Sequence, residues 1–240
     1  MVMKAAGFLL IMLSGGVLQS VTGFGLSVYA ICLLPLLMPM QQAVVVVSMM
    51  SAVVSIQILW KLYRRVNIRV AFPAVAASLI TQAAGFFLLV TVEEGILKKV
   101  LGIVLILLAA YNILFAGRIH IKACTRNGVI AGMISGILTG MFNVGGPPLV
   151  MYYLAACEDK EEYTATLQAS FIINIAVGLL MHALKGNITP ETLSYGALGM
   201  VAILPGVWLG MKIFHRLDRK MLSRVVYIFL GVMGVLQLVM

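Results

Sequence analysis

The stretch Thr22-Gly23-Phe24-Gly25-Leu26-Ser27 interrupts a run of apolar residues that extends from Ala5 to Met40. A straight helix rises about 1.5 Å per residue, so a helix over the whole run would be much longer than the bilayer's hydrocarbon core of about 30 Å. Each arm taken alone is short for a membrane span. The stretch therefore predicts a hairpin of two short helices that turns at the Gly-Phe-Gly.

The composition places the chain in a membrane. Of 240 residues, 62% are hydrophobic and only 10% are charged, whereas a soluble domain has about 25% charged residues. A soluble fold cannot cover so much apolar surface with polar groups. Polar and apolar residues do not alternate along the chain, as they would in the strands of a membrane β-barrel, so a barrel is not expected. We therefore predict an all-α integral membrane protein.

The two halves of the chain resemble each other. A second interrupted run covers residues 127–157, with its break at Asn143-Val144-Gly145-Gly146-Pro147-Pro148, and Gly23 falls on Asn143 when the halves are superposed. Three uninterrupted runs of about 20 residues, long enough for spanning helices, follow each break: 42–60, 73–92, 97–116, and 163–184, 192–212, 220–240. Such a period indicates duplication, with a membrane repeat at 1–116, a cytoplasmic linker at 117–126 and a second repeat at 127–240.

The basic residues predict the topology. If each interrupted run returns to the side it came from, only Lys4, Lys98, Lys99 and Lys185 lie on one side, and the other thirteen of the seventeen Lys and Arg lie opposite. If each run crosses the membrane, the division is nine against eight. Basic loops stay in the cytoplasm, so the first alternative puts both termini outside. Each half then crosses an odd number of times, which predicts two inverted-topology repeats, each a broken helical hairpin plus three transmembrane helices.

Inverted repeats with interrupted helices are typical of secondary transporters, which bind substrate near the midplane. A helix that starts inside the membrane offers unpaired N–H groups and partial positive charge, which together bind anions. We expect the substrate site at the breaks and at polar residues within the spans: Thr22, Gly23, Phe24, Gly25, Ser27, Ser48, Thr139, Asn143, Gly145, Gly146, Pro147, Gln168 and Asn174. Weaker candidates are Ser51, Ser55, Gln19 and Gln82. The alternative is that the glycines only allow close helix packing and that the hydroxyls bond their own helices.

Several classes of function have no support in the sequence. No Asp or Glu lies within a span, so we expect neither a carboxylate proton relay nor a carboxylate sodium site. The three cysteines are far apart, which predicts no disulfide framework and no zinc site. His182 lies near a helix end and is expected at the membrane interface. No catalytic motif is present, so we expect no enzyme, cofactor or metal. The basic residues lie in short loops between apolar runs, where they set the topology, so we expect no nucleic-acid partner.

The motif Gly16-Val17-Leu18-Gln19-Ser20-Val21-Thr22-Gly23-Phe24-Gly25 and the segment Gly132–Gly140, followed by Gly145-Gly146-Pro147, resemble the TauE/SafE sulfite exporter family. The second motif departs from the family's usual G-x-G-G-G, because Asn143 stands at the first glycine and Pro147 at the last. The resemblance implies a protein of the prokaryotic inner membrane that exports a small sulfur-containing anion, such as sulfite, sulfoacetate or another organosulfonate.

The expected function is thus a secondary transporter whose partners are a small anion and the lipid bilayer; a homo-oligomer is compatible with the sequence. The inside-negative potential would drive monoanion efflux with about 2.3 kcal/mol per 100 mV. Two alternatives are an anion channel and a membrane scaffold or assembly protein that transports nothing.

Overall fold

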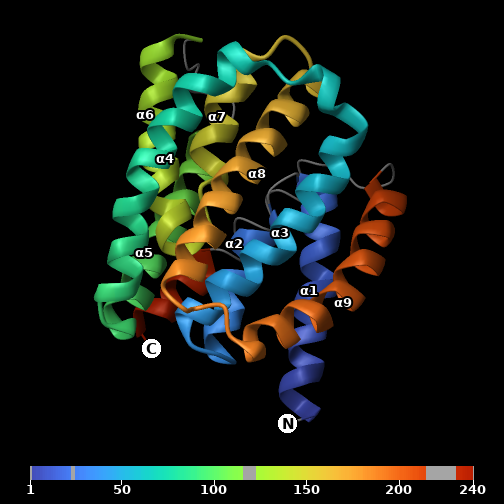
Figure 1. The fold of residues 1–240 in the computed structure, drawn as a ribbon, viewed down its shortest axis with the longest axis vertical. Helices are drawn as coiled ribbons and strands as arrows, with labels where there is room; N and C mark the ends of the chain where they lie inside the picture. The colour runs from blue at the N-terminus through green and yellow to red at the C-terminus, as the bar shows by residue number, and fades with distance from the viewer. Residues whose placement is uncertain (1, 23–24, 116–122, 215–230, 240) are drawn as a thin grey trace.

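The computed structural model describes residues 2–22, 25–115, 123–214 and 231–239 (Figure 1). No strand occurs in these ranges, and residues 231–239 are helical. The other helices are α1 (Val2–Thr22), α2 (Gly25–Leu33), α3 (Met40–Leu62), α4 (Ile68–Thr91), α5 (Glu94–Phe115), α6 (Thr125–Phe142), α7 (Gly146–Ala156), α8 (Lys160–Leu184) and α9 (Pro190–Phe214), with short 3-10 turns at Leu34–Leu36 and Tyr63–Arg65. The prediction of an all-α protein is confirmed.

Four of the described helices are long and apolar enough to cross a membrane: Met40–Arg65, Ile68–Thr91, Lys160–Leu184 and Pro190–Gly210. They contain most of the predicted spans 42–60, 73–92, 163–184 and 192–212. The predicted span 97–116 corresponds to α5. Most of the predicted span 220–240 and of the linker 117–126 lies outside the described residues.

Each interrupted run folds back on itself. In the first run, the Ser14 hydroxyl donates to Tyr29 Oη at 3.0 Å and Gln19 Oε1 accepts from the N–H of Leu26 at 3.0 Å, so α2 lies antiparallel to α1. In the second run, the Ser135 hydroxyl donates to the carbonyl of Gly145 at 2.7 Å, and Gly128 lies against the ring of Tyr152. In Figure 1, α6 descends from the top of the molecule and α7 returns to it. The described helices on either side of each break are therefore antiparallel, as the length argument predicts for a hairpin.

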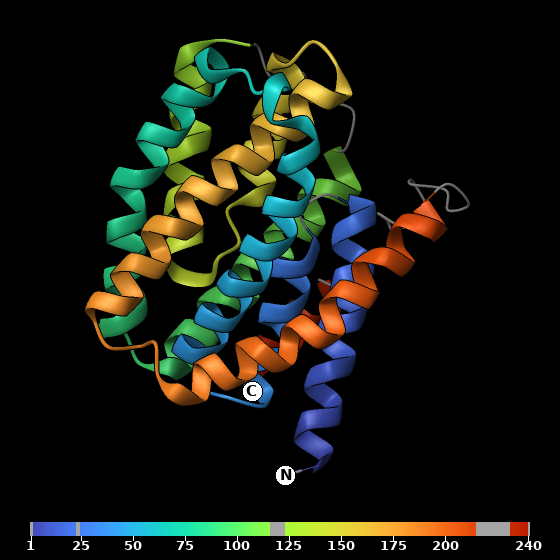
Figure 2. The same ribbon diagram turned by 45° about the vertical axis from the view of Figure 1, so that its right-hand side comes forward.

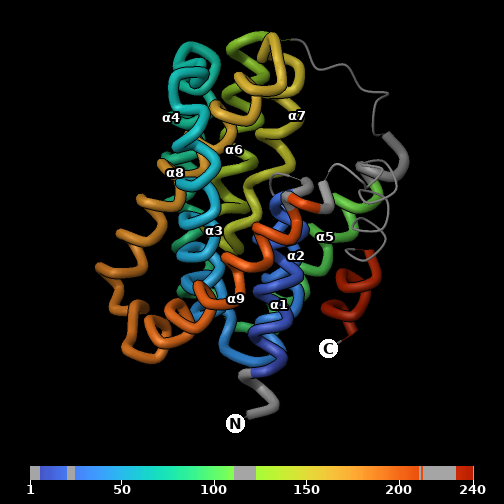
Figure 3. Tube along the Cα trace, turned by 90° about the vertical axis from the view of Figure 1, so that its right-hand side faces the viewer, coloured from blue at the N-terminus to red at the C-terminus, as the bar shows by residue number. Residues whose placement is uncertain are grey.

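Glycines bring α4 and α6 into direct backbone contact. A side chain on Gly132, Gly136 or Gly140 would collide with the backbone carbonyls of Ala74, Ser78 and Gln82, respectively. Along both helices the residue numbers of the paired positions rise together, so α4 and α6 run parallel. Figure 3 shows them side by side. Small residues allow such close approach between membrane helices.

A similar parallel pairing joins α1 and α9, which lie side by side in Figure 2. A side chain on Gly206 would meet the carbonyl of Leu13, and one on Gly210 would meet the carbonyl of Val17. In both pairings, the first helix of a hairpin packs against a helix from the other half of the chain. The two halves are thus interlocked rather than placed next to each other as separate domains.

Two loops meet at one end of the molecule, between α3 and α4 and between α7 and α8. Asp159 caps α8 by accepting the N–H groups of Glu161 and Glu162 at 2.8 and 2.9 Å. Arg65 Nε donates to Glu161 at 3.1 Å, and the N–H of Asn67 donates to the Thr166 hydroxyl at 3.0 Å. The N–H groups of Glu162 and Glu161, with the nearby Arg65, hold the pKa of the Asp159 carboxyl below its ordinary value. These contacts link the first half of the chain to the second.

Candidate functional site

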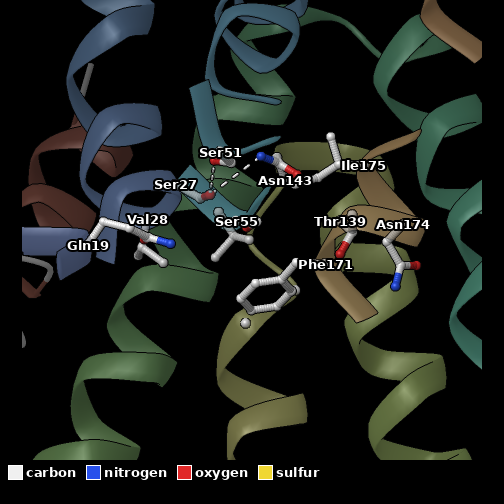
Figure 4. Close-up of a pocket in the computed structure, with 13 residues that line it drawn as sticks. Gln19, Ser27, Val28, Ser51, Ser55, Thr139, Asn143, Phe171, Asn174 and Ile175 are labelled. Carbon is white, nitrogen blue, oxygen red and sulfur yellow. Dashed lines mark hydrogen bonds between the residues drawn. The ribbon is translucent and has the colours of Figure 1, made fainter. Parts of the chain in front are cut away.

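The tips of the two hairpins meet inside the helix bundle. The Asn143 side-chain amide, at the end of α6, donates to the hydroxyl of Ser27 in α2 at 3.4 Å. The Ser27 hydroxyl shares a second hydrogen bond, 2.9 Å long, with the Ser51 hydroxyl of α3. Figure 4 shows these three side chains turned toward one another. The chain of hydrogen bonds connects residues that are 116 positions apart in the sequence.

A small cavity lies at this meeting point (Figure 4). Its volume is about 20 Å³, which is enough for about one water molecule. Its polar lining comes from Gln19, Ser27, Ser51, Ser55, Thr139, Asn143, Gly145, Gly146 and Asn174, and its apolar lining from Val28, Val144, Phe171 and Ile175. None of these lining residues is charged. The cavity therefore offers hydrogen bonds to a ligand without an opposite charge.

Asn143 owes its position to its backbone conformation. It is left-handed, with φ 57° and ψ 32°. Its N–H donates to Thr139 O at 2.8 Å, and the N–H of Val144 donates to Leu138 O at 3.2 Å. This pattern ends a helix with a left-handed residue, which is usually Gly and sometimes Asn. Asparagine thus makes the turn that a glycine would make and adds an amide that points to Ser27.

The backbone supplies fewer donors to the cavity than expected. At the start of α7, Pro147 and Pro148 have no N–H, which leaves the N–H groups of Gly145 and Gly146, and no side chain caps this helix. At the start of α2, the N–H of Leu26 donates to Gln19 Oε1 at 3.0 Å. In the first hairpin, a side chain of α1 therefore occupies an N–H group at the start of α2, and that group is not free for a ligand. Side chains provide most of the polar lining of the cavity.

Ser55, like Gln19 and Ser51, lines the cavity although the sequence makes it only a weaker candidate. Its side chain is fully buried, and its hydroxyl has no hydrogen-bond partner among the described residues. A buried polar atom without a partner is uncommon in proteins. In the sequence, Ser55 is marked only by its position one helical turn after Ser51 within an apolar run. Serines that bond the backbone of their own helix show the same pattern, so the sequence does not distinguish the two cases.

The structure brings together about half of the predicted residues. Ser27, Thr139, Asn143, Gly145, Gly146 and Asn174 line the cavity. Ser48 lines a second small cavity beside it. Gly25, Pro147 and Gln168 are buried but line neither. Gly23, Phe24 and the side chain of Thr22 lie outside what the structure describes. Whether the gathered residues bind a substrate stays a prediction.

Some predicted residues have clear structural tasks. A side chain on Gly145 would collide with Ser135 and Thr139, so this glycine allows α7 to pack against α6. Asn174 accepts from the Ser78 hydroxyl at 2.8 Å and donates to Ser170 O at 2.8 Å, which ties α8 to α4. His182 is 2% exposed and packs edge-on against Phe86. His182 therefore faces the helix bundle, and its position at the depth of the membrane interface stays a prediction.

A sequence model of the sulfite exporter TauE/SafE family matches residues 8–236. The chain belongs to the TauE/SafE family. A probable membrane transporter protein of Methanocaldococcus jannaschii is 27% identical over 168 residues, which cover 65% of this chain and 62% of the relative. No solved structure matches. TauE/SafE membership and this relative support a membrane transporter, and with the apolar helices they make the chain a multi-pass membrane protein.

Proposed function

We propose that this TauE/SafE protein is a secondary transporter that exports a small sulfur-containing anion, with the cavity between the hairpin tips as its binding site. Sulfite is the first candidate, since the family is described as sulfite exporters; sulfoacetate and other organosulfonates are the alternatives. One observation carries the proposal. Both hairpins contribute to one buried, uncharged polar cavity, and the Ser55 hydroxyl that lines it has no partner in the part of the chain that the structure describes.

The chemistry of the lining suits a transported anion. An anion that leaves water needs hydrogen-bond donors in exchange, and the Ser55 hydroxyl, the Asn143 amide and the N–H groups of Gly145 and Gly146 are available around the cavity. No Lys or Arg lines it. Binding that is favourable but not strengthened by an opposite charge lets a carried ion leave again.

The arrangement of helices supports the inverted repeat. The hairpin of the first half pairs with α9 of the second half, and the hairpin of the second half pairs with α4 of the first half. Both pairings are parallel, as a duplication with equivalent contacts requires, and the equivalent helices α1 and α6 run in opposite directions in Figure 1. The cavity holds about one water molecule, so a larger anion enters only when the halves or hairpins move apart. We propose that access alternates in this way, with the basic loops in the cytoplasm of a prokaryotic cell and both termini outside.

Counterflow in proteoliposomes tests the function. Purified protein should exchange external radiolabelled sulfite for internal sulfite, and the rate should saturate and rise with internal sulfite, as a carrier requires and a channel does not. Absence of flux for sulfite and all organosulfonates would contradict the proposal and leave a scaffold role. Single-channel currents would favour the channel.

Replacing Ser55 by Ala tests the site. We expect the apparent affinity for sulfite to fall about tenfold or more, because a hydrogen bond to a charged group contributes about 1.5–3 kcal/mol. The melting temperature should not fall, because the hydroxyl has no partner to lose. Ser194→Ala, an exposed serine that bonds its own helix, is the control and should transport normally. Unchanged affinity in Ser55→Ala would remove this residue from the site.

A further inference from the structure

A second small cavity adjoins the first and extends toward the end of α8. Its volume is about 10 Å³. It shares Thr139, Asn143 and Ile175 with the first cavity, and adds Ser48, Gln82 and His182 as polar lining. The second cavity therefore lies next to the proposed anion site, on the side away from the loops that contain Arg65 and Asp159.

Gln82 presents a buried acceptor at this second cavity. Its side chain is 1% exposed, and its Nε2 donates to the carbonyl of Asn174 at 2.8 Å. That bond assigns the two ends of the amide, because only the nitrogen can donate to a carbonyl. Oε1 then has no hydrogen-bond partner among the described residues. Burying an acceptor without a donor is unfavourable, so a donor from a bound water or from a ligand would satisfy Gln82 Oε1.

The neighbouring polar groups do not supply that donor. The amide of Asn187 lies 3.1 Å from His182 Nδ1 and donates to it, which fixes the ring orientation. His182 is also the only ionisable side chain among the residues that line the two cavities. No Asp, Glu, Lys or Arg from α3, α4, α6, α7 or α8 lines either one. Apart from His182, only neutral groups therefore face the charge of a ligand.

The two cavities differ in the hydrogen-bonding groups that they offer to a ligand. Around the first, Ser55 and Asn143 offer donors that suit a negative oxygen; at the second, Gln82 Oε1 repels a negative oxygen and accepts a proton donor. Asn143 lines both, so one small ligand at this amide can address both. A fully deprotonated dianion brings twice the charge and no donor, and an alkylsulfonate brings one charge and no donor.

We infer that the transported species is a singly charged oxyanion that keeps a hydrogen-bond donor, and that Gln82 Oε1 selects it by accepting that donor. Hydrogensulfite in its O–H form and hydroxylated sulfonates meet this description. Sulfite would then be carried with its proton. The inference rests on the proposed function and names the substrate class of its site.

Two nearly isosteric sulfonates test the inference without a pH change. Both 2-hydroxyethanesulfonate and propane-1-sulfonate are monoanions, and they differ by a hydroxyl in place of a methyl group. We expect 2-hydroxyethanesulfonate to inhibit sulfite counterflow at a concentration about tenfold lower than propane-1-sulfonate does, since one hydrogen bond separates them. Gln82→Met should abolish this preference. Gln41→Met, which removes a partly buried glutamine that bonds Leu89 O outside both cavities, should retain it.

Each outcome is decisive. Equal inhibition by the two sulfonates in the wild-type protein would overturn the inference and leave the proposed function intact, and it is also the result expected if a resident water satisfies Gln82. If the Gln82→Met variant still prefers 2-hydroxyethanesulfonate, another group accepts the hydrogen bond from its hydroxyl, and the role of Gln82 is overturned. If Gln82→Met does not fold, the wild-type comparison still decides on the substrate class. Absence of sulfite counterflow itself would instead contradict the proposed function.

Discussion

Asn143 combines a backbone task with a side-chain task. Its left-handed conformation ends α6 and starts the return of the chain toward α7. Its amide reaches Ser27 of the other hairpin. A glycine would perform the first task at least as well, because it has no Cβ to strain the left-handed turn. The asparagine therefore adds a contact with the other hairpin that a glycine could not make.

Substitutions of Asn143 separate the two tasks. Asn143→Gly should keep the melting temperature and weaken sulfite binding about tenfold, because only the amide is lost. Asn143→Ala should also destabilise the protein by about 1–2 kcal/mol, since a left-handed alanine is strained. Thermal unfolding with and without sulfite measures both effects. Normal sulfite stabilisation in Asn143→Gly would mean that the amide serves only the contact between the hairpins.

At the scale of elements, glycines determine which helices touch. The pairs α4/α6 and α1/α9 approach so closely that backbone carbonyls occupy the space of the missing side chains. Gly145 acts similarly within the second hairpin, where its lack of a side chain lets α7 start against Ser135 and Thr139. Gly145 therefore has a packing role in the second hairpin, in addition to the N–H group that it places at the cavity. A bulky residue at this position would disturb the packing of the hairpin, so a loss of transport in such a variant would not show that Gly145 binds the substrate.

Gly136→Ala tests the α4/α6 contact. The added methyl group would collide with the carbonyl of Ser78 and the hydroxyl of Thr81, and we expect a loss of about 1–3 kcal/mol from the overpacked interface. Gly95→Ala in α5 is the control, because open space surrounds this glycine and alanine favours the helix by about 1 kcal/mol. Denaturation in detergent measures both variants. Equal stability of the two would contradict the close contact.

At the scale of the molecule, charge is divided between two ends. The end of α3, the 3-10 turn Tyr63–Arg65 after it and the starts of α4, α6 and α8 lie at the top of Figure 1. They contain Lys61, Arg64, Arg65, Arg69, Arg126 and Lys160. The start of α5 and the end of α8 lie at the bottom, with Lys98, Lys99 and Lys185. Helical hairpins that return to their own side produce this division. The arrangement suits a membrane in which the basic end faces the cytoplasm.

Cysteine labelling of intact cells tests this orientation. In a background without Cys32, Cys124 and Cys157, Lys185→Cys should react with a membrane-impermeant maleimide added outside, because this exposed position lies at the less basic end. Arg64→Cys should react only after the cells are opened. Labelling of both from outside would contradict the hairpin topology, and the reverse pattern would place the basic end outside.

The sequence alone determined the membrane class, the helical hairpins and the expected spans, because hydrophobicity, helix length and charge are properties of contiguous residues. It also pointed to the breaks, and six of the thirteen predicted site residues line one cavity. Only the tertiary structure decided how each polar group is used. Leu26 N–H bonds Gln19, Asn174 bonds Ser78, and Ser55 bonds nothing among the described residues. These outcomes depend on contacts between helices far apart in the chain. Thr22–Ser27 and its counterpart at 143–148 mark where the chain turns, but the partners of a hydroxyl or an amide are fixed only once the helices pack.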